Sequence, residues 1–446
     1  MDPGPAAELQ AIPFVPGRAR GRLHTEPARA AGGGVLLARH EDLHRLHGRP
    51  AGLIVTRPAP FSHIMIGVLA AGIPTVLCTE CGDLRAGQCV EIDGASGRVR
   101  FLHAPCASVQ EAASGPPAAP RPLYTNDGTP VELRASVRSA AQARRAVARG
   151  AAAIGLVRSE FLLGTTRTPP ARCEDWLRPL RALCGAAAPV EVWVRLLDVA
   201  ADKRPPWMQG LDAGGGPLGL QGVRLFEQAA VRQVVDAQLQ ALRLLADEYR
   251  IGVILPFVSS GAEFAAWRRY VERRLGGGVA VVAMAEHPAV VLDLLAPPAG
   301  RQPVSVGCND LMQTFFAADR DRPELARYLD PYAPALFRFL DAFPTGRRED
   351  VQLCGLLSQL HGVLPVLLGL GFRRFSVDAV SIPWLAQSVR GLRLTEAERL
   401  AERVLTASDT RRVRDLLGVP AWLDPPGVPG VRAIRTLPPG RSGTPG

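Results

Sequence analysis

Short apolar runs alternate with longer segments of helical apolar spacing from residue 125 to residue 420. Eight of the apolar runs have the length of buried strands: Val131–Ala135, Ala152–Val157, Val190–Leu196, Gly252–Pro256, Val279–Met284, Pro303–Val306, Val351–Cys354 and Arg373–Val377. Amphipathic segments such as Ala229–Tyr249 separate them. Strands that alternate with helices pair in parallel, and eight such units in about 300 residues fit a closed barrel. The pattern therefore predicts an α/β protein whose larger part, residues 125–420, is a (β/α)8 TIM barrel.

Residues 1–115 follow a different, more β-rich pattern that predicts a separate small β/α domain. Its strand candidates, with a hairpin around Asp93-Gly94 at the end, are Phe14–Leu23, Val35–Leu37, Leu53–Val55, Thr75–Leu77 and Gln88–Phe101. Residues 116–124 continue a segment rich in Ala and Pro and are predicted to be a linker. Residues 421–446 are rich in Pro and Gly, so we expect a tail without regular structure.

The small domain contains one clear helix signal, between the runs Leu53–Val55 and Thr75–Leu77. Apolar residues recur at helical spacing from Ile64 to Ala71, which places Ser62 and His63 at the first turn. Backbone N–H groups at a helix start are unpaired and favour a negative charge, so an imidazole there could receive a phosphoryl group. A lone histidine in this position is more often structural. Its position alone leaves both interpretations open.

Composition narrows the classes of function. No apolar run is long enough to span a bilayer, and the N-terminus lacks the pattern of a signal peptide, so a cytoplasmic protein with no membrane partner is predicted. The eight cysteines are then expected to be reduced. The net charge is +10, but the arginines are dispersed and no basic block with interleaved aromatic residues predicts nucleic-acid binding. A basic balance also suits small anionic substrates.

Chemically distinctive side chains follow the predicted barrel strands, where barrel enzymes place their active sites. They are Arg158, Arg195, Lys203, Arg224, Glu286, Asn309, Asp310, Arg320 and Cys354, and Lys203 is the only lysine in the chain. Guanidinium groups bind phosphate and carboxylate, and two carboxylates with substrate oxygens are a typical Mg²⁺ site. A thiol could donate a proton to carbon. Taken singly, a strand-end Asp or Glu is often a helix cap, and a strand Cys is usually only buried.

Seven ordered motifs resemble those of the phosphoenolpyruvate (PEP)-utilising enzymes. Ser62-His63 with its helix and Gly72-Ile73-Pro74 is similar to the phosphohistidine segment of that family. VRSEFL, VRLLDVAADK, LGLQGVR, AMAEHP, SVGCNDLMQ and VQLCG resemble six barrel motifs in the family order, and the likeness covers residues 12–395. The arrangement is most like Enzyme I of the sugar phosphotransferase system, the phosphoenolpyruvate-protein phosphotransferases, but without the helical insert that docks the phosphocarrier protein.

The resemblance implies roles for the residues that match its motifs. His63 would be phosphorylated on a swivelling domain, Glu286 and Asp310 would hold Mg²⁺, and Cys354 would be the general acid. PEP would be bound by Arg158, Arg195, Arg224 and Arg320, supported by Lys203 and Asn309. The family also implies a homodimer through the barrel. The reaction would give pyruvate and a phosphohistidine. Its phosphoryl group would pass to an acceptor that the sequence does not identify, for which a phosphocarrier protein is the candidate.

Several positions depart from the family pattern. Leu69 stands where the helix usually has an Arg, and Leu356 stands where Glu usually follows Cys-Gly. These departures leave two alternatives open: a non-catalytic PEP-binding regulatory protein, and a barrel lyase or aldolase of the PEP/pyruvate type. The second alternative assigns no role to the N-terminal domain.

Overall fold

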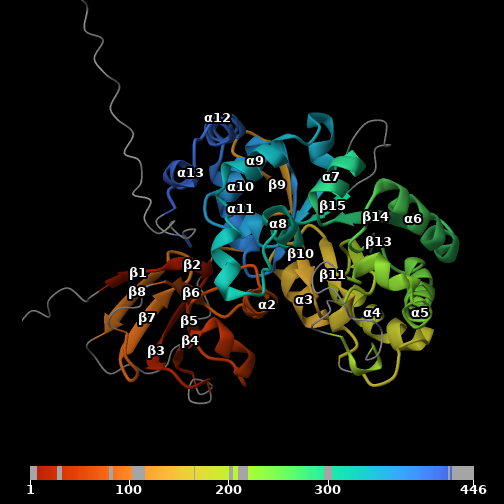
Figure 1. Cartoon of the computed structure of the whole chain (residues 1–446), viewed down its shortest axis with the longest axis horizontal. Helices are drawn as coiled ribbons and strands as arrows, with labels where there is room; N and C mark the ends of the chain where they lie inside the picture. The colour runs from red at the N-terminus through yellow and green to blue at the C-terminus, as the bar shows by residue number, and fades with distance from the viewer. Residues whose placement is uncertain are drawn as a thin grey trace, which may run out of the picture.

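The structure is a computed structural model and describes residues 8–27, 33–79, 84–102, 116–164, 166–199, 204–208, 219–295, 304–419 and 422–423. Two sheets organise this part of the chain, an eight-stranded one in the N-terminal quarter and a nine-stranded one beyond it (Figure 1). Apart from residues 422–423, the expected tail 421–446 lies outside the described residues.

Eight of the nine strands in the larger sheet form a closed parallel barrel. These are β10 (Pro130–Val137), β11 (Ile154–Arg158), β12 (Val192–Arg195), β13 (Ile251–Leu255), β14 (Ala280–Ala285), β15 (Val304–Gly307), β16 (Val351–Cys354) and β17 (Arg374–Asp378). Consecutive strands pair in parallel, and β10 closes the ring by pairing with both β11 and β17. All eight predicted strands are present, so the predicted TIM-barrel fold is confirmed.

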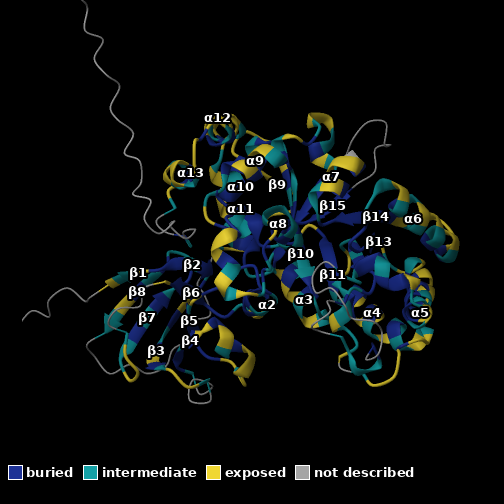
Figure 2. Ribbon diagram, viewed as in Figure 1, coloured by how far each residue is buried: buried dark blue, intermediate teal, exposed yellow. Residues whose placement is uncertain are grey.

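Helices cover the outside of the barrel, as the alternating pattern predicted (Figure 1). They are α3 (Ala140–Ala148), α4 (Cys173–Ala187), α5 (Ala229–Ala246), α6 (Gly261–Leu275), α7 (Pro288–Leu295), α8 (Cys308–Phe316), α9 (Pro334–Asp341), α10 (Val363–Gly369), α11 (Ile382–Gly391), α12 (Leu394–Leu405) and α13 (Thr410–Leu417). Figure 2 shows buried barrel strands and helices with exposed outer stripes, α5 among them. Burial of the inner helix faces against the strands is the main stabilising contribution.

The smaller sheet contains β1 (Glu8–Gln10), β2 (Ile12–Val15), β3 (Arg18–His24), β4 (Val35–Arg39), β5 (Gly52–Thr56), β6 (Thr75–Cys78), β7 (Cys89–Asp93) and β8 (Arg98–Leu102). Strands β3 to β6 pair in parallel, and the antiparallel β7–β8 hairpin adds to β3. The predicted strand Phe14–Leu23 is wrong as one element. It is two strands, because Pro16 and Gly17 interrupt it and Gly17 has a φ of 133°.

The segment predicted to be a linker contains a short strand. Strand β9 (Leu123–Tyr124) pairs antiparallel with Pro130–Val131 at the start of the barrel. Leu123 is buried, so this part of the linker is fixed against the barrel. The alanine- and proline-rich composition gave no indication of this pairing.

Helix α2 (His63–Ala71) lies between the smaller sheet and the barrel (Figure 1). Ser62 caps its start, since the Ser62 hydroxyl accepts a hydrogen bond from the Met65 N–H at 3.2 Å. Gly72 ends it in the left-handed conformation, with a φ of 66°. The buried residues Met65, Val68 and Leu69 join the core that also contains the barrel. This packing places His63 at the barrel mouth.

Among the described cysteines, one departs from the prediction of reduced thiols. Cys89 is disulfide-bonded, whereas Cys173, Cys184, Cys308 and Cys354 carry free thiols. Among the described residues, the helices are all too short or too polar to cross a membrane.

Candidate active site

His63 contacts the barrel through the loop that follows α8. The backbone N–H of His63 donates to Asp321 Oδ1 at 2.8 Å, and His63 Nδ1 lies 2.8 Å from Asp321 Oδ2. Arg320 donates from Nη1 to the Phe61 carbonyl at 2.9 Å, and its Nη2 lies 2.8 Å from His63 Nε2. Two consecutive barrel residues therefore hold the first turn of α2.

These contacts fix the tautomer of the His63 ring. A guanidinium group can only donate, so Nε2 must be the acceptor and carries a lone pair. Nδ1 then carries the proton and donates it to the Asp321 carboxylate. The arrangement leaves Nε2 as the nucleophilic nitrogen and orients it toward the barrel mouth.

The carboxylate of Asp321 is suited to a partner that becomes positively charged. Burial raises the pKa of the Asp321 carboxyl, but the hydrogen bond and charge of His63 and the guanidinium of Arg320 outweigh burial. The pKa therefore lies well below its ordinary value, and Asp321 is ionised at neutral pH.

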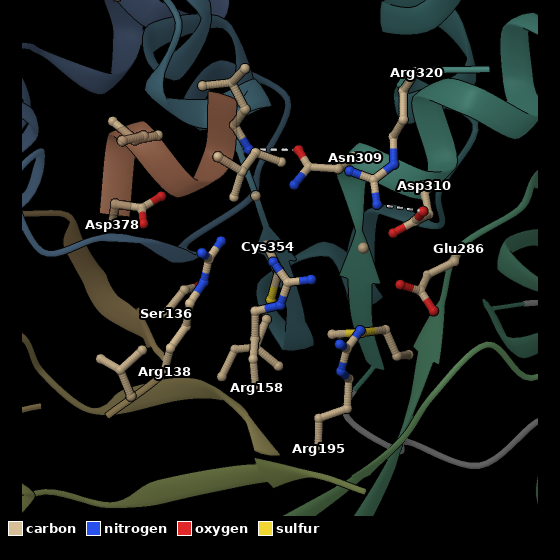
Figure 3. A pocket seen from close by; sticks show the side chains of 18 residues that line it. Ser136, Arg138, Arg158, Arg195, Glu286, Asn309, Asp310, Arg320, Cys354 and Asp378 are labelled. Carbon is tan, nitrogen blue, oxygen red and sulfur yellow. Dashed lines mark hydrogen bonds and ion pairs between the residues drawn. The ribbon is translucent and has the colours of Figure 1, made fainter. Parts of the chain in front are cut away.

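Two predicted arginines are held by carboxylates at one side of the barrel mouth. Glu160 Oε1 accepts from Arg158 Nε at 3.1 Å and from Arg195 Nη2 at 2.6 Å, and Asp198 lies 2.6 Å from Arg195 Nη1. Burial lowers the pKa of the Arg195 guanidinium, but Asp198 and Glu160 outweigh it and raise the pKa. Glu160 and Asp198 thus fix the guanidinium planes toward the pocket (Figure 3).

Glu286 and Asp310 follow β14 and β15 and line the same pocket (Figure 3). Burial raises the pKa of Glu286, and the carboxylates of Asp310 and Asp198 raise it further. For Asp310 burial also raises the pKa, but Arg320, at 3.0 Å from its Oδ1, together with His63, Arg195 and Arg158 outweighs burial and lowers it. A side chain at Gly307 would collide with the Glu286 carboxylate, since its Cβ would lie 2.6 Å from Oε1. Glycine therefore leaves the space that Glu286 occupies.

The two carboxylates fit a divalent cation. Repulsion between buried carboxylates costs free energy that a bound cation would offset, and hard oxygen ligands are those that Mg²⁺ prefers. Among the described residues there is no cluster of three or more His, Cys, Asp or Glu that could hold a metal ion. Substrate oxygens would have to complete the coordination.

Cys354 lies at the end of β16, inside the barrel. Its sulfur is 3.1 Å from Ser305 Oγ and 3.2 Å from Gln352 Nε2, which also donates to the Gly155 carbonyl at 3.0 Å. Burial raises the pKa of the Cys354 thiol, and the hydrogen bonds from its neighbours limit that rise. The thiol is therefore protonated at neutral pH, and these hydrogen bonds could stabilise a transient thiolate.

The remaining predicted residues differ in placement. Asn309 lines the pocket and accepts from the Leu356 N–H at 2.9 Å (Figure 3). Arg224 donates to Ser259 Oγ from Nε and Nη2, at 3.2 and 2.9 Å, and lies against the Phe257 ring behind the cavity wall. Lys203 lies outside the described residues.

The cavity beside these groups is large and open to the His63 ring. Its volume is about 770 Å³, and its lining includes His63, Arg158, Arg195, Asp310 and Arg320. Apolar side chains extend it away from His63, among them those of Phe161, Leu163 and Trp207. The predicted nucleophile, two predicted carboxylates and three predicted arginines therefore meet in one region, though they come from segments far apart in the sequence.

Three functional candidates were missed by the motif comparison. Asp321 directly follows Arg320, while Arg138 and Asp378 directly follow or end strands β10 and β17. Arg138 and Asp378 could have been predicted as site residues from their position at strand ends. No local pattern marks Asp321, because its contact with His63 joins residues 258 positions apart.

Comparison with known proteins agrees with this geometry. The family model described as "PEP-utilising enzyme, PEP-binding domain" matches residues 117–394. The chain belongs to the PEP-utilising enzymes. The match covers the whole barrel from β9 to the end of α11 and includes every predicted site residue except His63.

Curated relatives among the PEP-utilising enzymes extend the match toward the N-terminus. A multiphosphoryl transfer protein of Xanthomonas campestris is 30% identical over 82% of this chain and 46% of its own length. Phosphoenolpyruvate-protein phosphotransferases of Streptomyces coelicolor and Haloferax volcanii are 29% and 30% identical, over 81% and 83% of this chain and 67% and 68% of their own lengths. The chain thus spans about half the length of the first relative and about two thirds of the other two.

Proposed function

We propose that the protein is a PEP-dependent phosphotransferase in which PEP and His63 give pyruvate and a phosphohistidine. The single observation that carries the proposal is the position of His63 Nε2, in the cavity lined by Arg320 and Asp310 and 2.8 Å from Arg320 Nη2. The names of the relatives, which are phosphoenolpyruvate-protein phosphotransferases and multiphosphoryl transfer proteins, support the same reaction.

The transfer step needs a nucleophile, a clamp for the phosphoryl group and a leaving group. The Nε2 lone pair of His63 attacks phosphorus, and the bond from phosphorus to the enol oxygen breaks, so the electron pair leaves with the enolate of pyruvate. Arg158, Arg195 and Arg320 bind the phosphate and carboxylate oxygens and stabilise the charge on the transferring group. The ring becomes cationic once Nε2 is phosphorylated, and the Asp321 carboxylate stabilises that charge through Nδ1–H.

A divalent ion, Mg²⁺ in our proposal, would be held by Glu286 and Asp310 together with substrate oxygens. When bound, it supplies charge neutralisation at the phosphoryl group. The high pKa of Glu286 supports this assignment, since a cation would remove the repulsion between its carboxylate and that of Asp310.

Cys354 acts at the other end of the substrate. Its thiol gives a proton to the methylene carbon of the enolate, which becomes the methyl group of pyruvate. The resulting thiolate accepts hydrogen bonds from Ser305 and Gln352 until solvent returns the proton. Asn309 and Arg224 support the anionic substrate, and the same role is proposed for Lys203.

The phosphoryl group then passes to an acceptor, for which a phosphocarrier protein is the proposed class. Reaching it requires the small domain, proposed as residues 1–115, to move as a unit on a linker at 116–124 away from the barrel at 125–420. A cytoplasmic location and a homodimer through the barrel belong to the same proposal.

Release of pyruvate tests this function. PEP and Mg²⁺ are mixed with a stoichiometric amount of the protein, and pyruvate is measured enzymatically. One equivalent of pyruvate per chain from the wild type, and none from His63→Ala, supports the proposal. Pyruvate from both proteins would favour a barrel lyase, and pyruvate from neither, with PEP bound, would favour the regulatory alternative.

A further inference from the structure

Arg138, directly after β10, is a fourth guanidinium in the pocket formed by Arg158, Arg195 and Arg320 (Figure 3). Its side chain extends into the pocket and lies over the Phe161 ring, with 4.6 Å from Cζ to the ring centroid. None of the motifs that relate this chain to the PEP-utilising enzymes includes it. The role of Arg138 therefore has to come from its contacts.

The other three arginines of the pocket are already paired. Arg158 and Arg195 share the Glu160 carboxylate, and Arg320 lies 3.0 Å from Asp310. The Arg138 guanidinium, by contrast, makes no ion pair or hydrogen bond with any residue that the structure describes. It is the pocket cation whose charge is not neutralised by a contacting carboxylate.

The surroundings of Arg138 oppose its charge. Burial lowers its pKa to about 10, and the neighbouring charge of Arg158 contributes to the decrease. The Asp378 carboxylate partly counteracts this decrease, but its Oδ2 already accepts from Gln359 Nε2 at 3.2 Å. A guanidinium held half-buried beside another cation is expected where an anion binds.

Arg138 also faces helix α2, which carries His63. A Cβ built on Gly67 would lie 3.7 Å from Arg138 Nη1, and Leu69 lines the same pocket as Arg138. The Arg138 guanidinium therefore lies on the side of the pocket that faces α2.

We propose that Arg138 binds the anionic substrate on the α2 side of the pocket, as the barrel cation that contacts no carboxylate among the described residues. This inference rests on the proposed PEP-dependent function and adds a specific binding residue to it. Arg138 belongs to the barrel and would stay there when α2 moves toward the phosphoryl acceptor. The phosphohistidine would therefore leave the barrel without this cation.

The test is the rate at which His63 is labelled by radiolabelled PEP, measured in a single turnover at increasing PEP concentrations. Wild type is compared with Arg138→Ala, Arg138→Lys and the control Arg145→Ala, an exposed arginine on α3. We expect the half-saturating PEP concentration to rise between about ten- and a hundredfold in Arg138→Ala, as for a lost charged hydrogen bond. The half-saturating PEP concentration of Arg138→Lys should lie between those of the wild type and Arg138→Ala, because lysine keeps the charge but not the planar guanidinium. Arg145→Ala should show the wild-type dependence on PEP concentration, and no variant should have a lower melting temperature than the wild type.

Two results would overturn the inference. One is a wild-type dependence on PEP concentration in Arg138→Ala, and the other is a loss of labelling that accompanies a lowered melting temperature, which would make Arg138 structural. In both cases the proposed function stands, because the wild type is labelled. A wild type that takes no label from PEP would overturn the proposed function and this inference together.

Discussion

Asp321 holds His63 at two points, with its carboxylate oxygens 2.8 Å from the backbone nitrogen and 2.8 Å from ring Nδ1. One side chain of the barrel therefore both docks the start of α2 and selects the tautomer in which Nε2 carries the nucleophilic lone pair. The relationship between carboxylate and imidazole is the same as in other catalytic pairs, where the acid orients the base and stabilises its cation.

Replacing Asp321 should slow phosphorylation without preventing it. In Asp321→Ala the Nδ1 proton and the helix N–H lose their acceptor, so we expect the labelling rate of His63 to fall between about ten- and a thousandfold. Asp321→Asn keeps one carbonyl oxygen as an acceptor, so its labelling rate should lie between those of the wild type and Asp321→Ala. Rapid-quench labelling with saturating PEP measures both variants. Equal rates in Asp321→Ala and wild type would show that the contact has no role in transfer.

Removing the charge of Glu286 and removing that of Asp310 should change the melting temperature in opposite directions. The pKa of Glu286 is raised in the folded protein, so between its unfolded and folded pKa values the folded state loses stability as pH rises. Glu286→Gln should therefore raise the melting temperature at pH 7.5 in EDTA by a few degrees.

Asp310 provides the matched control for Glu286. Its pKa is lowered in the folded protein, so its charge stabilises the fold above the unfolded pKa, and that contribution is lost as pH falls through the folded pKa. Asp310→Asn should lower the melting temperature at pH 7.5. Both variants should lose the stabilisation that Mg²⁺ with PEP gives the wild type. A decrease in EDTA for Glu286→Gln would contradict the assignment of its raised pKa.

The role proposed for Cys354 predicts a pH profile. Burial raises its pKa above the ordinary 9.0, so the thiol keeps its proton, and pyruvate release should stay level as pH rises to about 9. Cys354→Ala should reduce the rate of enzyme-bound proton transfer to carbon by about 10²- to 10⁴-fold. Deuterium incorporation into the pyruvate methyl group during the reverse reaction measures this step. Wild-type incorporation in Cys354→Ala would exclude the thiol as the acid.

The cap of α2 makes a stability prediction that is separate from chemistry. Ser62 Oγ accepts from the Met65 N–H and lies 2.8 Å from Nε2 of the buried His40. Ser62→Ala removes the cap and one partner of His40, so we expect a loss of about 1–2 kcal/mol in the free energy of unfolding. Ser139→Ala, which removes only a cap, should cost about 1 kcal/mol or less. Urea denaturation measures both.

The sequence was sufficient for the barrel because each strand is a continuous apolar run between turn signals. The predicted strand Val351–Cys354 matches the observed strand residue for residue. Each of the other seven predicted strands differs from its observed strand by one or two positions at its ends. Buried parallel strands need apolar side chains on both faces, which gives this strong local signal. Shorter elements were less predictable. Leu123–Tyr124 pairs with Pro130–Val131, which precede the part of β10 that pairs with β17, and Phe14–Leu23 is divided by Gly17.

The site was predictable where it consists of strand ends and not where it depends on docking. Arg158 ends β11, Glu286 directly follows β14 and Asp310 lies three residues beyond β15, so the barrel topology alone brings them together. Asp321 contacts His63 across the interface between the barrel and α2, which no local pattern encodes. Arg224 lies in its predicted motif, but its side chain donates to Ser259, whose hydroxyl accepts from two of its nitrogens.

The most direct test of the central claim is the position of the phosphoryl group after reaction with PEP. Protein incubated with radiolabelled PEP and Mg²⁺ is digested, and the acid-labile label is located by peptide mapping and phosphorus NMR. The account predicts one label per chain, on Nε2 of His63, and none in His63→Ala. Label on another residue, or equal label in His63→Ala, would contradict it.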